Sequence, residues 1–488
     1  MRLIILLALA LLVPPWGAAA DAKPNILIII ADDLTWHDVR CFGGPTGALT
    51  PHLDALAAQG MRMTRFYSPA SVCSPTRQAL LTGLYPVRSG AYPNHAVVRA
   101  GTRSLPFHLQ ALGYRTGCFG KTHFGPDASY PFDVMDGFLT KKERKRAGGG
   151  GEDGGLEDEE LDLGALKTFI ADAAGKKQPF CAYIAPHEPH APWTVGDRSP
   201  YDAAKLVLPP YLVDTPLTRS DLVDYYAEVN HLDGTVGTVL SILEHAGQAD
   251  NTLVLFFSEQ GSSMPHGKWT LYDPGIRVAA IARWPGHIAA GTTNPALVQY
   301  VDVLPTIVAA AGGDPATLDA GCPDADGRTG LDGRSYLAAL EGKTTALRDL
   351  VFAEHTTRGI IKGSEAYASR AVCDGRWKLI ANLEPDAVFH NSTSDGALLR
   401  SWRQKGKEGD AFAAEQVARI PRRPALELYD LQADPWELTN LAERPEHAAR
   451  IATLHDQLDA WMKQQGDRGD QTEREAKEHQ GSGLKAEK

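Results

Sequence analysis

Acidic, amide, imidazole and amine side chains follow four apolar runs of this sequence, close to the point where each run ends. These candidates are Asp32, Asp33, Lys121, His123, His187, His190, Glu259, Gln260 and Lys268. Carboxylate and amide oxygens without paired cysteines suit a hard divalent cation such as calcium or magnesium. Such a cation beside lysine and arginine can hold a tetrahedral dianion or an ester of one. The residue types therefore indicate chemistry on an anionic group.

A further candidate is the segment 73–77, Cys-Ser-Pro-Thr-Arg, which is followed by Leu81-Thr82-Gly83. Proline is favourable in the first turn of a helix, and glycine is favourable just after its last turn. Cys73 then lies at the positive end of the helix dipole, where an anion is favoured. Arg77 lies four residues further on, close enough to face Cys73. The alternative interpretation is a buried structural cysteine in front of a helix.

The elements that must position these side chains are short buried strands and longer helices. The run 24–30 is continuously apolar and rich in β-branched residues, which predicts a strand buried on both faces; further strands are predicted near 115–119, 180–185 and 251–257. One helix is predicted from Thr50 and Pro51 to Gly60, and a long one from a capping box at Thr218 and Asp221 to Gly247. This alternation predicts a layered α/β domain, in which the carboxyl ends of the strands bring the candidates together.

The remaining organisation is predicted from composition along the chain. Residues 1–20 are typical of a signal peptide with a cleavage site at Ala18-Ala19-Ala20, the alternative being a membrane anchor. We expect a catalytic domain over 21–365, with a mobile insertion at 141–160. A smaller C-terminal α+β subdomain is expected over 366–465, with strands at 372–380 and 426–431 and a helix at 448–462. A charged disordered tail is expected over 466–488.

Composition excludes several classes of protein. Lys and Arg number 49 and Asp and Glu number 60, so the net charge is −11 at pH 7, which argues against nucleic acid as a partner. Hydrophobic residues make up 43% of the chain, an ordinary value for a globular protein and not for a disordered one. After signal removal no run reaches transmembrane length. The six cysteines form no zinc-binding pattern, and we expect few or no disulfides.

The motifs resemble those of the formylglycine-dependent sulfatases, whose pattern C-x-P-x-R with L-L-T-G is present from Cys73 to Gly83. The resemblance covers nearly the whole mature chain, with motifs in the family order. It continues in Ala31-Asp32-Asp33, Gly120-Lys121-Thr122-His123, His187-Glu188-Pro189-His190, Gly267-Lys268-Trp269, Arg283-Trp284-Pro285-Gly286 and Leu428-Tyr429-Asp430-Leu431. It implies an alkaline-phosphatase-like α/β/α sandwich with a small C-terminal sheet domain.

The resemblance also implies a reaction. A separate formylglycine-generating enzyme would oxidise Cys73 to an aldehyde, which hydrates to a geminal diol. One hydroxyl attacks sulfur and the alcohol or amine leaves; the second hydroxyl then loses its proton, the aldehyde re-forms and sulfate is expelled. A sulfated serine would need hydrolysis, whereas a sulfated diol ejects sulfate by itself.

Roles are implied residue by residue. Asp32, Asp33, Glu259, Gln260 and the modified Cys73 would bind calcium. Arg77 and Lys121 would position and polarise the diol, with help from His123. His187 would donate a proton to the leaving group, and Lys268 would hold the sulfate. The residues expected to contact the rest of the substrate are His190, His355 and Arg370.

Two departures from the family pattern concern the metal site and the helix. Glu259-Gln260 stands where the family usually has Asp followed by Asn, Gln or His, and Thr76 stands where Ser or Ala is usual. Glutamate is one methylene longer, so either the calcium site shifts or Glu259 ligates differently. Neither change removes a functional group that the reaction needs.

The substrate is not fixed by these motifs. Several segments are similar to sulfamidases, the heparan N-sulfatases, among them 115–117, 125–126, 130–133, 208–211 and 379–383. N-sulfoglucosamine is therefore favoured, with O-sulfated sugars and aryl sulfates as alternatives. Two other classes stay open: a phosphoesterase of the same superfold and an inactive glycan-binding homologue. The signal peptide predicts an exported enzyme, periplasmic or secreted, or lysosomal in a eukaryote.

Overall fold

The computed structural model describes residues 23–480 except 45–46, 140–159 and 361. The expected signal peptide therefore lies outside the described residues, as does nearly all of the expected insertion at 141–160. The large domain is built on one eight-stranded sheet in the order β4-β3-β5-β1-β6-β7-β2-β8. Its strands are β1 Asn25–Ile30, β2 Met61–Tyr67, β3 Arg115–Gly120, β4 Val134–Asp136, β5 Phe180–Ala185, β6 Thr252–Phe257, β7 Arg277–Arg283 and β8 Thr292–Gln299.

The centre of this sheet is parallel. β1 lies between β5 and β6, and Ile28 is in register with Tyr183 on one side and Leu255 on the other. β3 and β4 continue the parallel arrangement, whereas β7 runs antiparallel to both β6 and β2. The carboxyl ends of β1, β3, β5 and β6 consequently meet at one edge of the sheet, as the sequence predicted.

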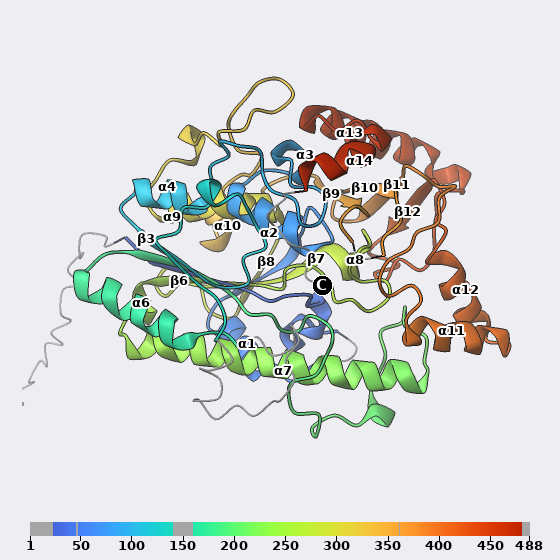
Figure 1. The fold of residues 1–488 in the computed structure, drawn as a ribbon, viewed down its shortest axis with the longest axis horizontal. Helices are drawn as coiled ribbons and strands as arrows, with labels where there is room; N and C mark the ends of the chain where they lie inside the picture. The colour runs from blue at the N-terminus through green and yellow to red at the C-terminus, as the bar shows by residue number, and fades with distance from the viewer. Residues whose placement is uncertain (1–22, 45–46, 140–159, 361, 481–488) are drawn as a thin grey trace, which may run out of the picture.

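Helices cover both faces of the sheet (Figure 1). On one face lie α2 Cys73–Thr82, α3 Pro86–Ser89, α4 Leu105–Ala111, α9 Val303–Ala310 and α10 Leu337–Leu340; on the other lie α1 Pro51–Ala58, α6 Leu163–Lys176 and α7 Pro216–His245. Alternate residues of β1 enter the two cores: Ile28 packs in the cluster that contains Leu80, and Leu27 in the cluster that contains Leu53. A strand buried on both faces explains the continuous apolar run in the sequence.

The local sequence sets the boundaries of helices α2 and α7. α2 begins at Cys73 and ends at Thr82, and Gly83 caps it in the left-handed conformation, in agreement with the predicted stop at this glycine. The predicted capping box at Thr218 was wrong, because α7 begins earlier, at Pro216. The side chain of Thr215 caps this helix by accepting a hydrogen bond from the backbone N–H of Thr218. Proline at the first helical position suits that start.

The C-terminal part forms a second, antiparallel sheet in the order β12-β11-β10-β9. Its strands are β9 Val351–Thr356, β10 Ala368–Cys373, β11 Trp377–Asn382 and β12 Leu426–Asp430. The single strand predicted at 372–380 is in fact a hairpin, because the Asp374 carboxylate accepts hydrogen bonds from the backbone of Arg376 and Trp377 and closes a turn. β9 belongs to this sheet although it precedes the expected boundary at residue 366.

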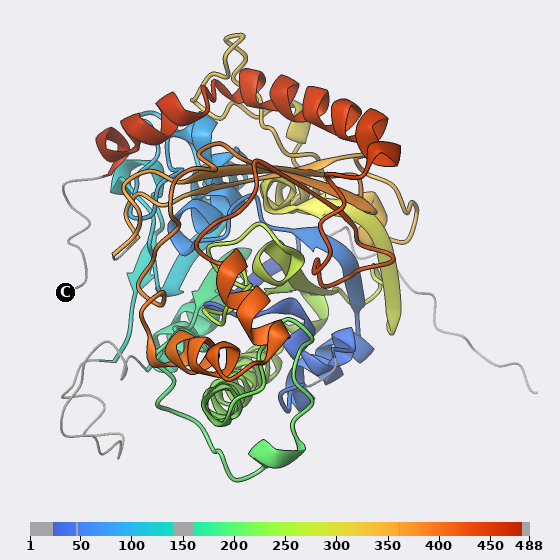
Figure 2. The same ribbon diagram turned by 90° about the vertical axis from the view of Figure 1, so that its right-hand side faces the viewer.

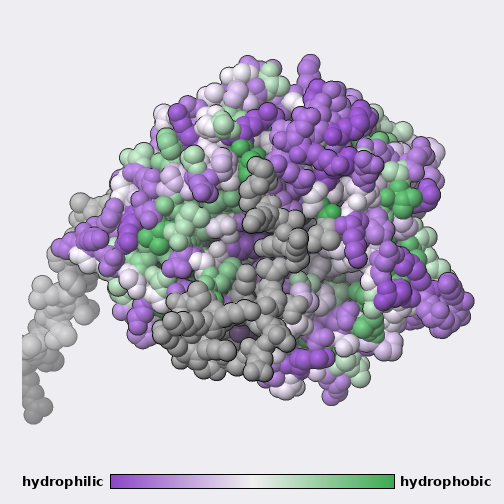
Figure 3. Space-filling model, viewed as in Figure 1, coloured by the Kyte–Doolittle hydropathy of each residue, from purple (hydrophilic) through white to green (hydrophobic). Residues whose placement is uncertain are grey.

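Helices flank the small sheet (Figure 2). α11 Ala397–Lys407 and α12 Ala411–Arg419 are inserted between β11 and β12, and α13 Ala448–Gln465 lies across the strands with Trp461 buried against them. On the face seen in Figure 3, hydrophilic side chains predominate and hydrophobic ones form small separate patches. Among the described residues, none of the helices is long and apolar enough to cross a membrane. All six cysteines are described, and each is a free thiol.

Residues 466–480 differ from the disordered tail that the sequence predicted. They form α14 Asp470–Glu475 and a 3-10 turn, Ala476–His479, packed on the body of the protein. Asp467 makes a fully buried ion pair with Arg370, and the Glu473 carboxylate accepts a hydrogen bond from the backbone of Thr357. Composition alone could not reveal this, because these charged groups have partners far away in the sequence.

The Arg370–Asp467 pair predicts a large effect of mutation on stability. Arg370→Ala leaves a buried carboxylate without its cation, which costs about 3–5 kcal/mol. The exposed pair of Arg474 and Asp470 is a matched control, and Arg474→Ala should cost less than about 1 kcal/mol. Urea unfolding followed by circular dichroism measures both. Equal losses in the two variants would contradict the importance of the buried pair.

Candidate active site

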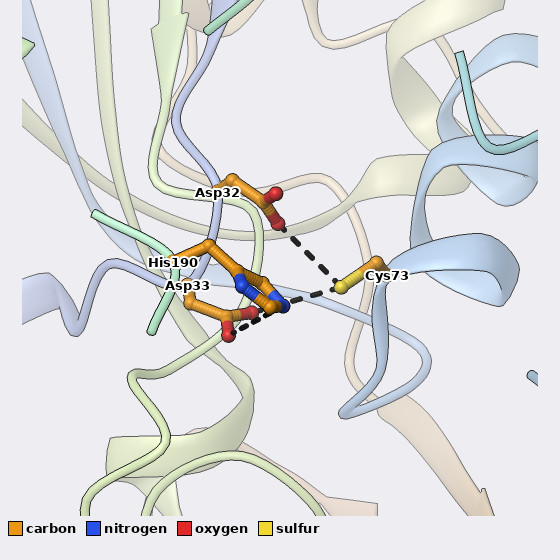
Figure 4. Close-up of side chains that lie close together, drawn as sticks. All are labelled: Asp32, Asp33, Cys73 and His190. Atoms are coloured by element: carbon orange, nitrogen blue, oxygen red, sulfur yellow. Dashed lines mark hydrogen bonds and ion pairs between the residues drawn. The ribbon is translucent and has the colours of Figure 1, made fainter. Parts of the chain in front are cut away.

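The predicted side chains meet at the carboxyl edge of the large sheet. Asp32 and Asp33 follow β1, Lys121 and His123 follow β3, His187 and His190 follow β5, and Glu259 and Gln260 follow β6. Lys268 comes from the loop before α8 Asp273–Ile276, and Cys73 opens α2. Most of these side chains are buried, including Asp32, Cys73 and Lys268. Figure 4 shows Cys73 pointing toward the two aspartates and His190.

Asp32 lies among three basic side chains. Its carboxylate is 2.6 Å from Lys121 Nζ and 3.5 Å from an Arg77 guanidinium nitrogen, and His187 Nε2 is 3.9 Å away. Burial alone would raise the pKa of Asp32, but Lys121, His190 and Arg77 outweigh burial and hold the pKa well below its ordinary value. Asp32 is therefore an anion surrounded by cations, well suited to coordinate or orient a charged group.

Asp33 organises the opposite side of the cluster. Lys268 Nζ lies 2.7 Å from its Oδ2 atom, and His190 Nε2 lies 3.6 Å from the same atom. Its Oδ1 atom accepts a hydrogen bond of 2.5 Å from the Gln260 amide. Asp33 also has a φ of 64°, a strained conformation for a residue with a side chain, which fits a functional position.

Cys73 lies between the two aspartates. Its Sγ atom is 3.5 Å from Asp32 Oδ1 and 3.6 Å from Asp33 Oδ1, as drawn in Figure 4. Burial, followed by the carboxylate of Glu259, raises the pKa of the Cys73 thiol well above its ordinary value. A protonated thiol is a poor nucleophile. The environment therefore favours neither a thiolate nor direct attack by unmodified sulfur.

Arg77 and Glu259 form a fully buried pair. The distance from Arg77 Nε to Glu259 Oε1 is 2.5 Å, and the other Glu259 oxygen accepts a hydrogen bond from the backbone N–H of Asp33. Arg77 also donates to the backbone oxygen of Lys121 and to the hydroxyl of Tyr183. Burial raises the pKa of Glu259, and Arg77 opposes that rise. An aspartate at this position would be one methylene too short for the same contact.

The donor set fits a hard cation at this edge of the sheet. Within the described residues, Asp32, Asp33, Cys73 and His190 offer ligand atoms that all lie within 4.8 Å of one another. The Oε1 atom of Gln260 is buried and makes no hydrogen bond, so it is available as a neutral oxygen ligand beside them. Glu259 is not in this group; its carboxyl group contacts both Arg77 and Asp32. The ligand role expected for Glu259 stays a prediction.

Two histidines form the solvent-facing side of the cluster. The rings of His187 and His190 lie 4.9 Å apart, and their side chains are 15% and 29% exposed. His190 Nε2 also lies 3.4 Å from Lys268 Nζ. Burial lowers the pKa of His187 to about 4, although Asp32 opposes this shift. Both rings are placed to meet a group that approaches from solvent.

Two of the predicted substrate contacts lie elsewhere. Arg370 is fully buried and paired with Asp467, so it belongs to the packing of the small domain. His355 is buried as well, and its Nδ1 atom contacts the hydroxyl of Ser71. His355 is 1% exposed and Arg370 is 0% exposed, so neither side chain reaches solvent. The expectation that they touch the sugar does not fit these positions.

Two residues of the site, Tyr183 and His95, were not predicted from the sequence. Tyr183 contacts Arg77 from inside β5, where it reads as an ordinary apolar strand residue. His95 makes a hydrogen bond of 2.9 Å from its Nδ1 atom to Nε2 of His123. His95 follows neither a strand nor a recognised motif, and its left-handed backbone is invisible in the sequence.

Comparisons with known proteins agree with this geometry. The sulfatase family model matches residues 24–313 of the chain. The chain is 30% identical over 455 residues to an ulvan-active sulfatase of Formosa agariphila, covering 92% of this chain and 82% of that protein. It is 30% identical over 480 residues to N-sulphoglucosamine sulphohydrolase of Homo sapiens, covering 90% of each.

A solved structure supports the fold. The structure of a protein in complex with its substrate D-glucosamine-2-N,6-O-disulfate matches with a TM-score of 0.64 and 21% identity, over 92% of this chain and 99% of that one. At this identity the likeness concerns the fold alone. The expected fold class, an alkaline-phosphatase-like α/β/α sandwich with a smaller C-terminal α+β subdomain, is confirmed.

The positions of Asp33 and Glu259 predict different effects on metal affinity. Asp33→Asn removes a charged ligand and should weaken calcium binding by about tenfold or more. Glu259→Gln should change the affinity by less than about threefold, because this carboxylate faces Arg77 and lies outside the ligand group. Isothermal titration calorimetry measures both, with the exposed Asp250→Asn as a control. A loss in Glu259→Gln as large as in Asp33→Asn would show that Glu259 ligates the ion.

Proposed function

This chain belongs to the sulfatase family of hydrolases that cleave sulfate esters, and from that premise we propose that it is a calcium-dependent enzyme acting on sulfated glycans through a formylglycine made from Cys73. The observation that carries the proposal is the position of Cys73 between two carboxylates and three cations, Arg77, Lys121 and Lys268. Carboxylates suit a divalent ion, and the cations suit the oxygens of a sulfate group.

The residues that would hold calcium are Asp32, Asp33, the amide oxygen of Gln260 and the modified residue 73. When present, calcium supplies positive charge to the sulfate oxygens, and the hydrated formylglycine supplies the attacking hydroxyl. A modified residue that offers oxygen would complete an oxygen-rich set, which a hard cation prefers over sulfur.

Lys121, Arg77 and Lys268 have separate roles in this proposal. Lys121 and Arg77 approach Asp32 from one side, where they fix residue 73 and stabilise negative charge beside it. Lys268 approaches Asp33 from the other side, next to His190, and these two side chains would bind sulfate oxygens. Because these groups are held in place before substrate arrives, they stabilise developing charge without reorganisation.

In this proposal, His187 and His123 transfer protons. His187 lies on the solvent-facing side of the cluster, where a leaving alcohol or amine would depart, and it donates the proton that the leaving group needs. An anionic substrate beside His187 favours the protonated ring. His123 lies on the side of Lys121 and assists proton removal at residue 73.

For the substrate, we propose a sulfated sugar, with the sulfamate of N-sulfoglucosamine favoured. Similarity along 90% of the chain to a human N-sulphoglucosamine sulphohydrolase supports this choice. Similarity to an ulvan-active sulfatase supports the alternative, an O-sulfated glycan. The presence of Arg77, Lys121, His187 and Lys268 in one cluster argues against an inactive glycan-binding homologue. We propose that residues 1–20 direct export, so that the enzyme meets its glycan outside the cytoplasm.

Maturation of Cys73 tests the proposed function. The chain should be produced with and without a formylglycine-generating enzyme, and mass spectrometry of the tryptic peptide Phe66–Arg77 should quantify loss of sulfur at position 73. We expect sulfate release from sulfated sugars to rise in proportion to the converted fraction, and Cys73→Ala to be inactive. Full activity of chain with wholly unmodified Cys73 would refute the mechanism.

The role of His187 predicts a dependence on the leaving group. A phenolate leaves without help, whereas an amine or a sugar alkoxide needs a proton. His187→Ala should therefore reduce turnover of N-sulfoglucosamine or an alkyl sulfate by about 10²-fold, and turnover of 4-nitrophenyl sulfate far less. Steady-state rates on both substrates give the comparison. Equal losses would exclude His187 as the acid and point to Lys268 or His123.

A further inference from the structure

The mechanism leaves unexplained the contact between His95 and His123. The two rings are linked by a hydrogen bond of 2.9 Å between His95 Nδ1 and His123 Nε2. A hydrogen bond between two imidazoles needs an N–H on one ring and a lone pair on the other. The bond therefore engages Nε2 of His123 and leaves Nδ1 as its second nitrogen; Nδ1 can accept a proton when His123 Nε2–H donates and His95 Nδ1 accepts.

The other nitrogen of His123 is left for the reaction. Its Nδ1 atom is buried and makes no hydrogen bond in the structure. After burial, Lys121, His95 and Arg77 are the strongest influences on the pKa of His123, which they lower. His123 thus lies beside the cations of the site with one nitrogen held by His95 and the other unused.

Both histidines have a costly backbone conformation. His95 has a φ of 60° and His123 a φ of 49°, values that side-chain-bearing residues seldom adopt. Such a conformation persists only where surrounding contacts enforce it. The loop 94–98 that carries His95 is indeed held on several sides.

On one side, hydrogen bonds hold the loop against helix α2. The backbone oxygen of Ala96 accepts hydrogen bonds from Ser74 and Gln78 of α2, the helix that begins at Cys73. The backbone N–H of Val98 donates to Gly125, two residues after His123. The loop therefore bridges residue 73 and the His123 segment.

On the other side the loop is held by the C-terminal segment. Ala96 pairs with Gln480 in an antiparallel bridge, and the backbone N–H of Val97 donates to His479. The side chain of Gln480 donates to the backbone oxygen of Asn94 at 2.9 Å. The segment 476–480, which we call the strap, is anchored by buried Ala476 and by the ring of Tyr92 against His479.

We infer that His95 is a positioning residue that orients His123 and, by accepting its Nε2–H, leaves Nδ1 free to take a proton in the reaction, and that the strap holds His95 in place. The inference rests on the proposed function, in which His123 assists proton removal at residue 73. It assigns a catalytic purpose to a segment that composition predicts to be disordered. A base oriented by a third group is a recurrent arrangement in enzymes that activate a hydroxyl nucleophile.

Two substitutions at position 95 isolate the hydrogen bond. Asparagine and glycine both accept a positive φ, but only asparagine offers a polar atom near the place of Nδ1. We expect His95→Gly to lower kcat on a sulfate ester about 10–100-fold with little change in KM, and His95→Asn to stay within about threefold of the natural chain. Added imidazole should restore part of the kcat of His95→Gly, a rescue that a structural defect would not show.

Two truncations test the strap. Ending the chain after Glu475 removes residues 476–488 but keeps the Arg370–Asp467 and Glu473 contacts. Ending it after Gln480 removes only residues 481–488 and keeps every strap contact described above, so the two chains differ by the strap. The first should lower kcat about as much as His95→Gly, and the second should not change it. If the shorter chain fails to fold, Gln480→Ala tests the strap, and the comparison of His95→Gly with His95→Asn tests the role of His95.

Controls separate this inference from the proposed function. Conversion of Cys73 should be equal in all variants by mass spectrometry, so that a maturation defect is not read as a catalytic one. An inactive but fully converted natural chain would refute the proposed function. Equal kcat in His95→Gly, His95→Asn and the natural chain, with no response to imidazole, would overturn the role of His95 alone.

Discussion

The structure depends on the neutralisation of buried charge at the edge of the large sheet. The carboxyl groups of Asp32 and Asp33 lie in a place that water barely reaches, and buried charges are tolerated only with closely placed counter-charges. Lys121, Arg77 and Lys268 supply those charges. Arg77 also donates to the backbone oxygen of Lys121 and to the hydroxyl of Tyr183. Charges placed in advance in this way are what stabilisation of a charged transition state requires.

This constraint also accounts for Glu259. Arg77 is completely buried, and the side chain of Glu259 joins Asp32 beside it, with 2.5 Å between Arg77 Nε and Glu259 Oε1. A longer side chain than aspartate reaches Arg77, whereas Asp32, Asp33 and residue 73 offer the clustered ligand atoms, with the unpaired Gln260 oxygen beside them. The departure from the family pattern is therefore a redistribution of contacts within the same cluster.

Much of the architecture could be predicted because it depends on local signals. The run at 25–30, the proline in the first turn of α2 and the glycine at 83 each fix an element through its own sequence. Because the carboxyl ends of parallel strands meet at one edge of a sheet, the aspartates, Lys121, His187 and Lys268 could be predicted to form one site. Contacts between distant segments could not be predicted in this way. From the sequence, Arg370 was predicted to contact substrate, but in the structure it pairs with Asp467. His95 gave no signal in the sequence, and only the structure shows its hydrogen bond to His123. Short turns such as 374–376 escape for a similar reason, because one aspartate side chain decides whether a strand continues.

The most direct test of this account is a crystal structure of the Cys73→Ala variant with calcium and a bound sulfated sugar. The account predicts the sulfate group next to position 73, with its oxygens within hydrogen-bonding distance of Lys121, Lys268 and His190. Calcium should lie between Asp32 and Asp33, and the leaving oxygen or nitrogen should face His187. A sulfate group bound away from position 73, or a cluster in which Lys121 and Lys268 stay on the aspartates without touching the substrate, would contradict it.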